Sequence, residues 1–138
     1  MAAASPHRLV SISRLTDLKG VSKTSEGGLR IGALTTITEV AESPVIKELF
    51  PGLSRAASEV ASPALRNRGT IGGNLCQKPR CWYYRGEFHC ARKGGDTCYA
   101  LGGENHYHGI LGSDHTCCIV HPSDTAPMLV ALGASVRV

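Results

Sequence analysis

The chain has 138 residues, 42% hydrophobic and 19% charged, so it can bury one modest core and is too short for two full domains. This composition excludes a disordered tail, and the net charge of +4 comes from scattered basic residues, which argues against nucleic-acid binding. No stretch approaches the roughly 18 apolar residues of a membrane helix, and the N-terminus lacks the apolar segment of a secretory signal. We therefore expect a cytoplasmic protein without membrane association.

The first half of the chain predicts a small core of short elements. Residues 27–34 alternate apolar and polar side chains, which is typical of a half-buried strand after a Gly-Gly turn. Thr36 and Glu39 have the spacing of a capping box, so a short helix is expected there, and Pro44 is expected to begin another. Apolar residues at spacings of three and four predict a helix over Pro51–Ala61.

The second half has fewer regular signals. Residues 66–75 are interpreted as a Gly-rich turn or strand. Asp124 is a candidate N-cap for a helix that Gly133 closes, with contact to a ribose as the second reading, and residues 135–138 predict a strand.

Residues 76–117 are rich in Gly, Cys, His and Arg and show neither helical nor strand periodicity. A structureless run of this length is improbable unless a ligand orders it. Without a secretory signal, cysteines favour a metal or iron-sulfur site over disulfides. The candidate ligands are Cys81, Cys90, Cys98 and Cys117, whose spacing matches neither a zinc ribbon nor a bacterial ferredoxin and leaves the metal open. The histidines of the segment, each interpreted as solvated or bonded to backbone, are His89, His106, His108 and His115.

The run from Gly69 to Asn74 has two readings. Paired glycines let backbone amides approach an anion, and Asn74 offers both a donor and an acceptor. The commoner alternative is a tight turn in which Asn tolerates an unusual dihedral. The glycine spacing fits no phosphate-binding or dinucleotide fingerprint.

The order of these motifs carries a resemblance. The segments LRIGAL, PGLSRAASEVASPALRNRGTIGGNL, RCWYYRG and CCIVHPSDTAPMLVALGA together resemble the FAD-binding subunit of the molybdenum hydroxylase (xanthine dehydrogenase) family, and within it the bacterial aldehyde oxidoreductase branch and, more distantly, the 4-hydroxybenzoyl-CoA reductase branch. The resemblance implies an α+β fold. The chain would be the middle part of a two-subdomain FAD-binding domain of the xanthine dehydrogenase medium-subunit type. Residues 6–75 and 118–138 would form the core, and 76–117 a Cys-rich loop insert.

The same resemblance assigns roles to individual residues. The flavin-contacting turn would comprise Thr70, Gly72, Gly73 and Asn74, and Asp124 would contact the FAD ribose. A [4Fe-4S] cluster would be held by Cys81, Cys90, Cys98 and Cys117. Cys117 stands seven residues before Asp124, as the family's ligand does; Cys118 is the alternative, and Cys76 is a spare thiol.

The resemblance also implies a function. The chain would belong to a subunit that passes electrons from a partner molybdenum subunit, through a [2Fe-2S] subunit, to FAD and an acceptor, with no catalytic acid, base or nucleophile of its own. We expect the family's N-terminal pyrophosphate loop and C-terminal subdomain to be absent, the FAD site to be incomplete and the chain alone to be inactive. The alternatives are periplasmic export with a signal-bearing partner, and a zinc-stabilised Cys/His-rich basic binding module.

Overall fold

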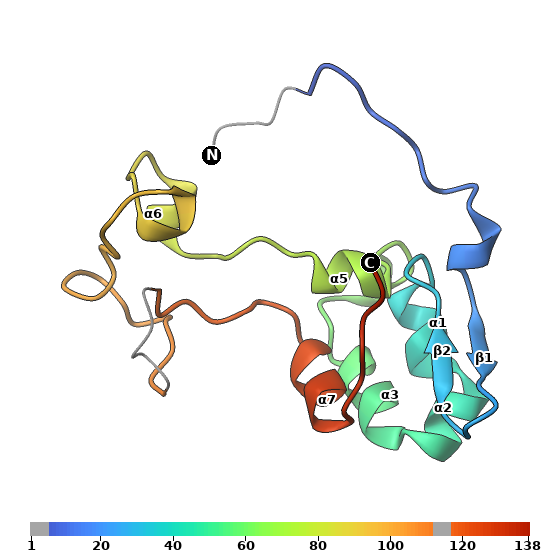
Figure 1. The fold of residues 1–138 in the computed structure, drawn as a ribbon. Helices are drawn as coiled ribbons and strands as arrows, with labels where there is room; N and C mark the ends of the chain where they lie inside the picture. The colour runs from blue at the N-terminus through green and yellow to red at the C-terminus, as the bar shows by residue number, and fades with distance from the viewer. Residues whose placement is uncertain (1–5, 112–116) are drawn as a thin grey trace. The chain divides into compact units, whose positions relative to one another are not determined.

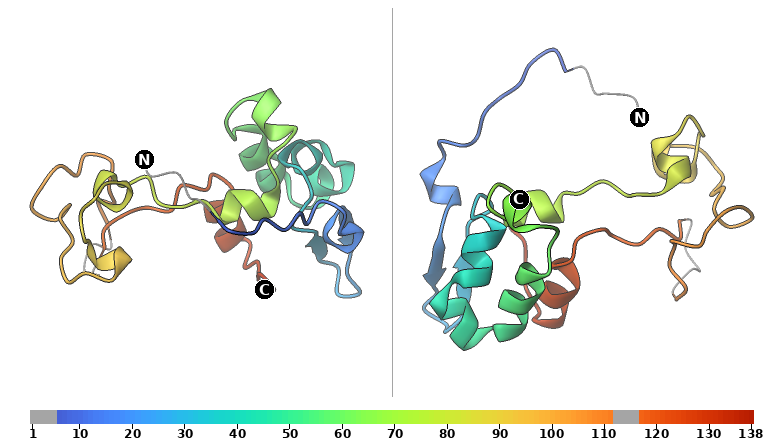
Figure 2. Two further views of the ribbon diagram at one scale, coloured as in Figure 1. Left: turned by 90° about the horizontal axis from the view of Figure 1, so that it is seen from above. Right: turned by 180° about the vertical axis from the view of Figure 1, so that it is seen from behind.

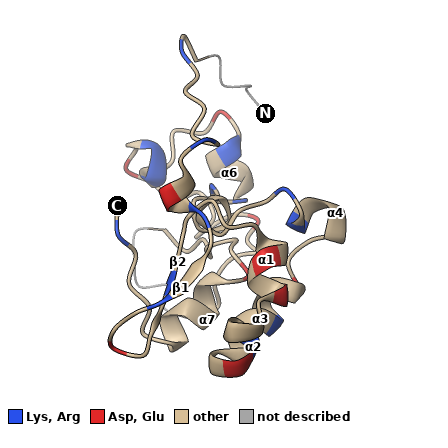
Figure 3. Cartoon of the chain, turned by 90° about the vertical axis from the view of Figure 1, so that its right-hand side faces the viewer, with Lys and Arg blue, Asp and Glu red and all other residues tan. Residues whose placement is uncertain are grey.

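The computed structural model describes residues 6–111 and 117–138, and the chain divides into two compact units. Residues 8–77 and 123–138 form the helical unit, and residues 78–122, with the described residues 6–7, form the cysteine-rich unit (Figure 1). Within the described residues, no helix combines the length and the apolar character needed to cross a membrane. Lys and Arg occur on separate segments of each unit rather than in one run (Figure 3).

The helical unit is an assembly of short helices beside a small hairpin (Figure 1). Strands β1 and β2 pair antiparallel, with Val21 opposite Ile31. The elements are the 3-10 helix η1 (Thr16–Leu18), strands β1 (Val21–Lys23) and β2 (Leu29–Ile31), and helices α1 (Ile37–Glu42), α2 (Pro44–Leu49), α3 (Pro51–Ser58), α4 (Pro63–Arg66), α5 (Ile71–Leu75) and α7 (Ala126–Ala131).

Local sequence signals begin the helices where they were expected. At the start of α1 the Glu39 N–H donates to Thr36 Oγ1 at 3.2 Å, and the Thr36 N–H donates to Glu39 Oε2 at 2.7 Å, which confirms the capping box. Proline is the first residue of both α2 and α3, where its missing N–H costs no hydrogen bond. Helix α3 ends at Ser58, earlier than predicted, and Ala61 then takes a positive φ of 44°, which a right-handed helix cannot contain.

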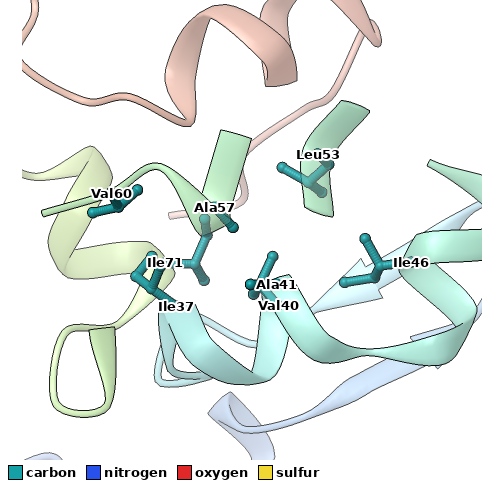
Figure 4. Close-up of a cluster of buried hydrophobic side chains, with 8 residues drawn as sticks. All are labelled: Ile37, Val40, Ala41, Ile46, Leu53, Ala57, Val60 and Ile71. Atoms are coloured by element: carbon teal, nitrogen blue, oxygen red, sulfur yellow. The ribbon is translucent and has the colours of Figure 1, made fainter. Parts of the chain in front are cut away.

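The core of the helical unit lies between α1, α2, α3 and α5 (Figure 4). Ile46 and Ala57 are completely buried. Full burial of one aliphatic side chain contributes about 1.5–3 kcal/mol, so this cluster is what holds the short helices together. Its members are Ile37, Val40, Ala41, Ile46, Leu53, Ala57, Val60 and Ile71.

Three predictions near the ends of elements are wrong. Residues 71–75 form the helical turn α5 instead of a turn or strand, because the Thr70 side chain caps it, accepting from the Gly73 N–H at 3.1 Å. Asp124 does not cap α7; Thr125 holds the N-cap position, and Ser123 Oγ accepts the Ala126 N–H at 3.0 Å. Residues 135–138 are described, and they form no strand because no neighbouring strand pairs with them.

The cysteine-rich unit is mostly irregular, in agreement with its lack of periodicity (Figure 2). Its described residues contain helix α6 (Trp82–Arg85) and the 3-10 helix η2 (Ala91–Lys93), with an isolated bridge between Cys90 and Thr97. The turn from η2 closes on Gly94, whose φ of 94° suits glycine.

Candidate functional site

The turn from Thr70 to Asn74 is fixed beside the start of α1. The Ile71 N–H donates to the Thr35 carbonyl at 2.9 Å, and the Gly72 N–H donates to the Ala33 carbonyl at 2.9 Å. A Cβ on Gly72 would lie 2.8 Å from that carbonyl oxygen, so only glycine allows this approach. The backbone of residues 33–35 and the helical turn α5 therefore form one rigid corner.

The hydrogen bonds of this corner refine the role of its glycines. The Gly72 N–H is bonded to Ala33, and the Gly73 N–H is bonded to Thr70 Oγ1. Neither amide is left to donate to an anion, contrary to the reading in which paired glycines present their amides. The missing side chain of Gly72 instead lets its backbone pack directly against Ala33.

A buried amide joins this turn to the segment around Asp124. Asn74 is buried, and its Oδ1 accepts hydrogen bonds from Ser123 Oγ at 2.5 Å and from Thr125 Oγ1 at 2.7 Å. Asp124 stands between these two hydroxyl residues and is exposed. The structure thus brings Asp124 next to the Thr70–Asn74 turn, about fifty residues away in the chain.

Ser123 and Thr125 were missed by sequence reasoning. The only available signal was the hydroxyl residue on each side of Asp124, which by itself is commoner at helix starts. Because Oδ1 of Asn74 is used twice, the NH2 group of its side chain is the part that remains to serve as a donor.

The four predicted cysteine ligands line one small cavity inside the cysteine-rich unit, of about 10 Å³. Cys81 and Cys90 are buried, Cys98 and Cys117 are half-buried, and all six cysteines of the chain are free. Among the described residues, no three His, Cys, Asp or Glu side chains come close enough together to hold a single metal ion. The thiols therefore surround a common space without meeting at one point.

Hydrogen-bond donors surround the sulfur of Cys98. Burial raises the pKa of this thiol, but hydrogen bonds from the backbone of Cys118, Ala100 and Leu101 and from the Cys118 side chain outweigh it, and the pKa is lowered. For Cys118 the pKa is raised, first by burial and then by the neighbouring Cys98. The two side chains are thus hydrogen-bonded neighbours whose pKa values move in opposite directions.

His108 lines the same cavity and is the residue that sequence reasoning placed wrongly. It was interpreted as solvated or bonded to backbone, yet both of its ring nitrogens are buried and have no hydrogen-bond partner in the structure as described. A buried polar group without a partner costs on the order of 1–3 kcal/mol. No sequence signal distinguished it from its neighbours.

The other histidines of the segment behave differently. His89 is exposed, and His106 is exposed with its Nε2 3.7 Å from Glu104 Oε2. His115 lies outside the described residues. Among the described histidines of the unit, only His108 lines the small cavity.

A larger cavity of about 380 Å³ adjoins the cysteine cavity. Its walls are mainly apolar and include Trp82, Tyr107 and Val120. Cys81, His108 and Ile119 line both cavities and so form the boundary between them.

Comparison with known proteins defines the class of this chain. Residues 1–138 match the family described as the FAD binding domain in molybdopterin dehydrogenase, which fits a small mixed domain of helices and short strands. The chain belongs to this family of flavin-binding domains.

Three relatives illustrate the range of the family. The chain is 37% identical over 134 residues to the aldehyde oxidoreductase FAD-binding subunit PaoB of Escherichia coli (strain K12), a match that covers 96% of this chain and 42% of PaoB. It is 40% identical over 73 residues to the carbon monoxide dehydrogenase medium chain of Hydrogenophaga pseudoflava, covering 52% of this chain and 25% of that one. It is 38% identical over 71 residues to the glyceraldehyde dehydrogenase medium chain of Sulfolobus acidocaldarius, covering 51% and 25%. The chain thus spans less than half the length of these relatives.

Proposed function

We propose that this chain is part of the FAD and [4Fe-4S] electron-transfer subunit of a molybdenum-dependent aldehyde oxidoreductase or xanthine dehydrogenase-type complex. Residues 6–75 and 118–138 would form the flavin-binding core, and residues 76–117 the iron-sulfur insert. The partners would be a molybdenum-cofactor subunit and a [2Fe-2S] subunit, and the complex would work in the cytoplasm, where thiols remain reduced. The cavity that four cysteines line carries the proposal.

The number of thiols that line the cavity fits a four-iron cluster. A zinc ion would draw four sulfur atoms to about 2.3 Å from one point. In a four-iron cube each iron takes its own cysteine, so the ligands stand further apart around a larger group. The backbone N–H groups around Cys98 are also suited to a thiolate that carries part of a cluster's negative charge.

The geometry supports Cys117 as the fourth ligand. Cys117 lines the cavity with the other three cysteines. Cys118 is buried beside Cys98 and does not line that cavity. Its side chain hydrogen-bonds to Cys98 instead.

The match with PaoB supports the assignment to the aldehyde oxidoreductase branch. Because it covers 96% of the chain, it runs across the cysteine-rich unit, whereas the match with the carbon monoxide dehydrogenase chain covers 52%. A relative that includes this segment is the better guide to what the segment does.

The helical unit would hold part of FAD, which when bound takes up electrons from the partner and passes them to an acceptor. The turn from Thr70 to Asn74, held in place by its backbone hydrogen bonds to residues 33–35, would contact the flavin. Asn74, fixed by Ser123 and Thr125, would donate from its NH2 group. The exposed Asp124 carboxylate would accept hydrogen bonds from the ribose hydroxyls.

Anaerobic reconstitution of the full chain with iron and sulfide tests the cluster. We expect about four irons per chain and a brown colour. The single replacements Cys81→Ser, Cys90→Ser, Cys98→Ser and Cys117→Ser should each lower the iron content. Cys76→Ser is the matched control, because Cys76 is exposed and lies in the helical unit, and it should retain full iron.

Two outcomes would contradict parts of this proposal. A colourless protein with one zinc per chain would replace the cluster with a zinc-stabilised module. Full iron in Cys117→Ser together with lost iron in Cys118→Ser would make Cys118 the fourth ligand.

A further inference from the structure

We propose that His108 donates a hydrogen bond to the sulfur atoms of the group held by the four cysteines and thereby raises its reduction potential. This inference rests on the proposed iron-sulfur site and adds a residue that is not one of its ligands. It assigns a function to a side chain that the fold of the unit does not otherwise use.

The side chain of His108 makes no hydrogen bond within the described residues. Both ring nitrogens are buried and unpartnered. Buried polar groups in folded proteins almost always have a partner, and an exception points to a bound ligand, ion or water. The cavity that His108 lines is the one formed by Cys81, Cys90, Cys98 and Cys117, so a ligand between those thiols is within reach of the imidazole.

The backbone around His108 is tied to the segments that carry two of the cysteines. The His108 N–H donates to the Asn105 carbonyl at 2.9 Å, and the Asn105 side chain donates to the Ala100 carbonyl at 3.0 Å. The Gly109 N–H donates to the Cys118 carbonyl at 2.8 Å. These bonds hold His108 between the chain following Cys98 and the chain following Cys117.

Chemistry identifies the imidazole as a donor in this position. A neutral imidazole carries one N–H donor and one acceptor nitrogen. Cluster sulfides and thiolates are acceptors with negative charge, and four thiolates already satisfy the irons. An N–H donor stabilises the cluster more after it has gained an electron, because the negative charge on sulfur increases. Hydrogen bonds to the sulfurs are one of the factors that set cluster potentials. The proton remains on the ring throughout.

Redox titration of the reconstituted full chain, followed by electron paramagnetic resonance, tests the proposal. His108→Phe keeps the ring size and removes both nitrogens. We expect it to retain full iron and to lower the reduction equilibrium constant by about tenfold, which is about 59 mV for one electron. His108→Gln keeps an N–H donor and should recover part of the shift.

His106→Phe is the matched control, because His106 is two residues away, exposed and absent from the small cavity. It should leave the potential unchanged. An equal shift in His106→Phe, or no shift in His108→Phe, would overturn the proposal. Loss of iron in both His108 variants would also overturn it, since His108 would then be needed to hold the cluster.

A measurement on the unaltered protein covers the case in which the variants fail to fold. With 15N-labelled histidine, the reduced cluster should show one weakly coupled nitrogen and an exchangeable proton. A strong nitrogen coupling would make His108 a ligand, and no coupling would remove it from the site. Wild-type protein that binds no iron contradicts the proposed function itself. Wild-type protein that binds full iron, but whose His108 shows no nitrogen coupling and no effect on the reduction potential, contradicts only this inference.

Discussion

The two units bury different kinds of side chain. In the helical unit the buried cluster is aliphatic, with Ile37, Val40, Ile46 and Leu53 each no more than 3% exposed. In the cysteine-rich unit the buried hydrophobic residues are Cys81, Cys90, Ala100 and Cys118. The first unit is thus stabilised by its own side chains, while the second has thiols where a core would be.

Aromatic contacts only partly compensate for this lack of a core. The ring centroids of Tyr83 and Phe88 lie 5.0 Å apart and those of Phe88 and Tyr99 lie 5.2 Å apart. Phe88 is 46% exposed and Tyr99 39%, so much of their surface remains in water. The proposed cluster would supply the order of this unit, because metal binding and folding are coupled in small metal-bound regions.

Removal of the proposed cluster should produce the largest difference between the two units. Chelation of iron from the reconstituted chain should expose residues 78–122 to protease while the helical unit persists. The expected effect is large, since the unit has few buried contacts besides those of its thiols. Limited proteolysis and hydrogen exchange, read segment by segment, give the measurement.

Helix α3 serves as the internal reference in that experiment. Its amides should exchange at the same rate before and after chelation, because its core is aliphatic. Unchanged protection of residues 78–122 after complete loss of iron would show that the cysteine-rich unit folds without a ligand.

A second experiment perturbs the helical unit alone. Ile46→Ala removes a completely buried side chain from α2 and should lower the free energy of unfolding by about 2–5 kcal/mol. The measurement is urea unfolding followed by far-ultraviolet circular dichroism. Leu49→Ala on the same helix, where the side chain is 40% exposed, should cost much less.

The iron content of Ile46→Ala tests whether the two units are stabilised independently of each other. Under conditions where the variant is still folded, it should reconstitute with the same iron per chain as the parent protein. A proportional loss of iron would contradict the view that the two regions obtain their stability separately.

Sequence predicted the helical unit well where the signal was local. The capping box at Thr36 and the prolines at the starts of α2 and α3 act within one helical turn, so neighbouring residues suffice to specify them. The predictions were wrong where contacts with residues distant in the sequence determine the local structure. Residues 135–138 have strand-like composition, but no strand in the described part of the chain pairs with them. Asp124 does not cap α7, where Ser123 accepts the Ala126 N–H and both Ser123 and Thr125 bond to Asn74.

The candidate site was predictable by residue type and less so by geometry. Four cysteines in an aperiodic segment indicated a ligand-bound region, and the structure places those four around one cavity. The burial of His108 could not be read from the sequence, because the segment has no helical or strand periodicity that would place one histidine inside and another outside. Likewise, the amides of Gly72 and Gly73 are engaged by Ala33 and Thr70, and the Ala33 contact depends on a segment about forty residues away.

The smallest expected effect concerns the charge at the start of α1. Hydrogen bonds from the Thr36 backbone and then from its side chain hold the pKa of Glu39 below its ordinary value of 4.5. A lowered pKa stabilises the folded state above the ordinary value, and this contribution is lost as the pH falls through the folded pKa. Glu39→Gln should therefore cost about 0.3–1 kcal/mol at neutral pH, and its deficit relative to the parent protein should shrink as the pH is lowered below 4.5. Urea unfolding at stepwise lower pH measures the difference.

Glu59→Gln is the control, because its 2.7 Å pair with Arg55 is largely exposed and such pairs contribute little. A deficit of Glu39→Gln that stayed constant with pH would assign its effect to altered hydrogen-bond geometry at the cap instead of to the carboxylate charge.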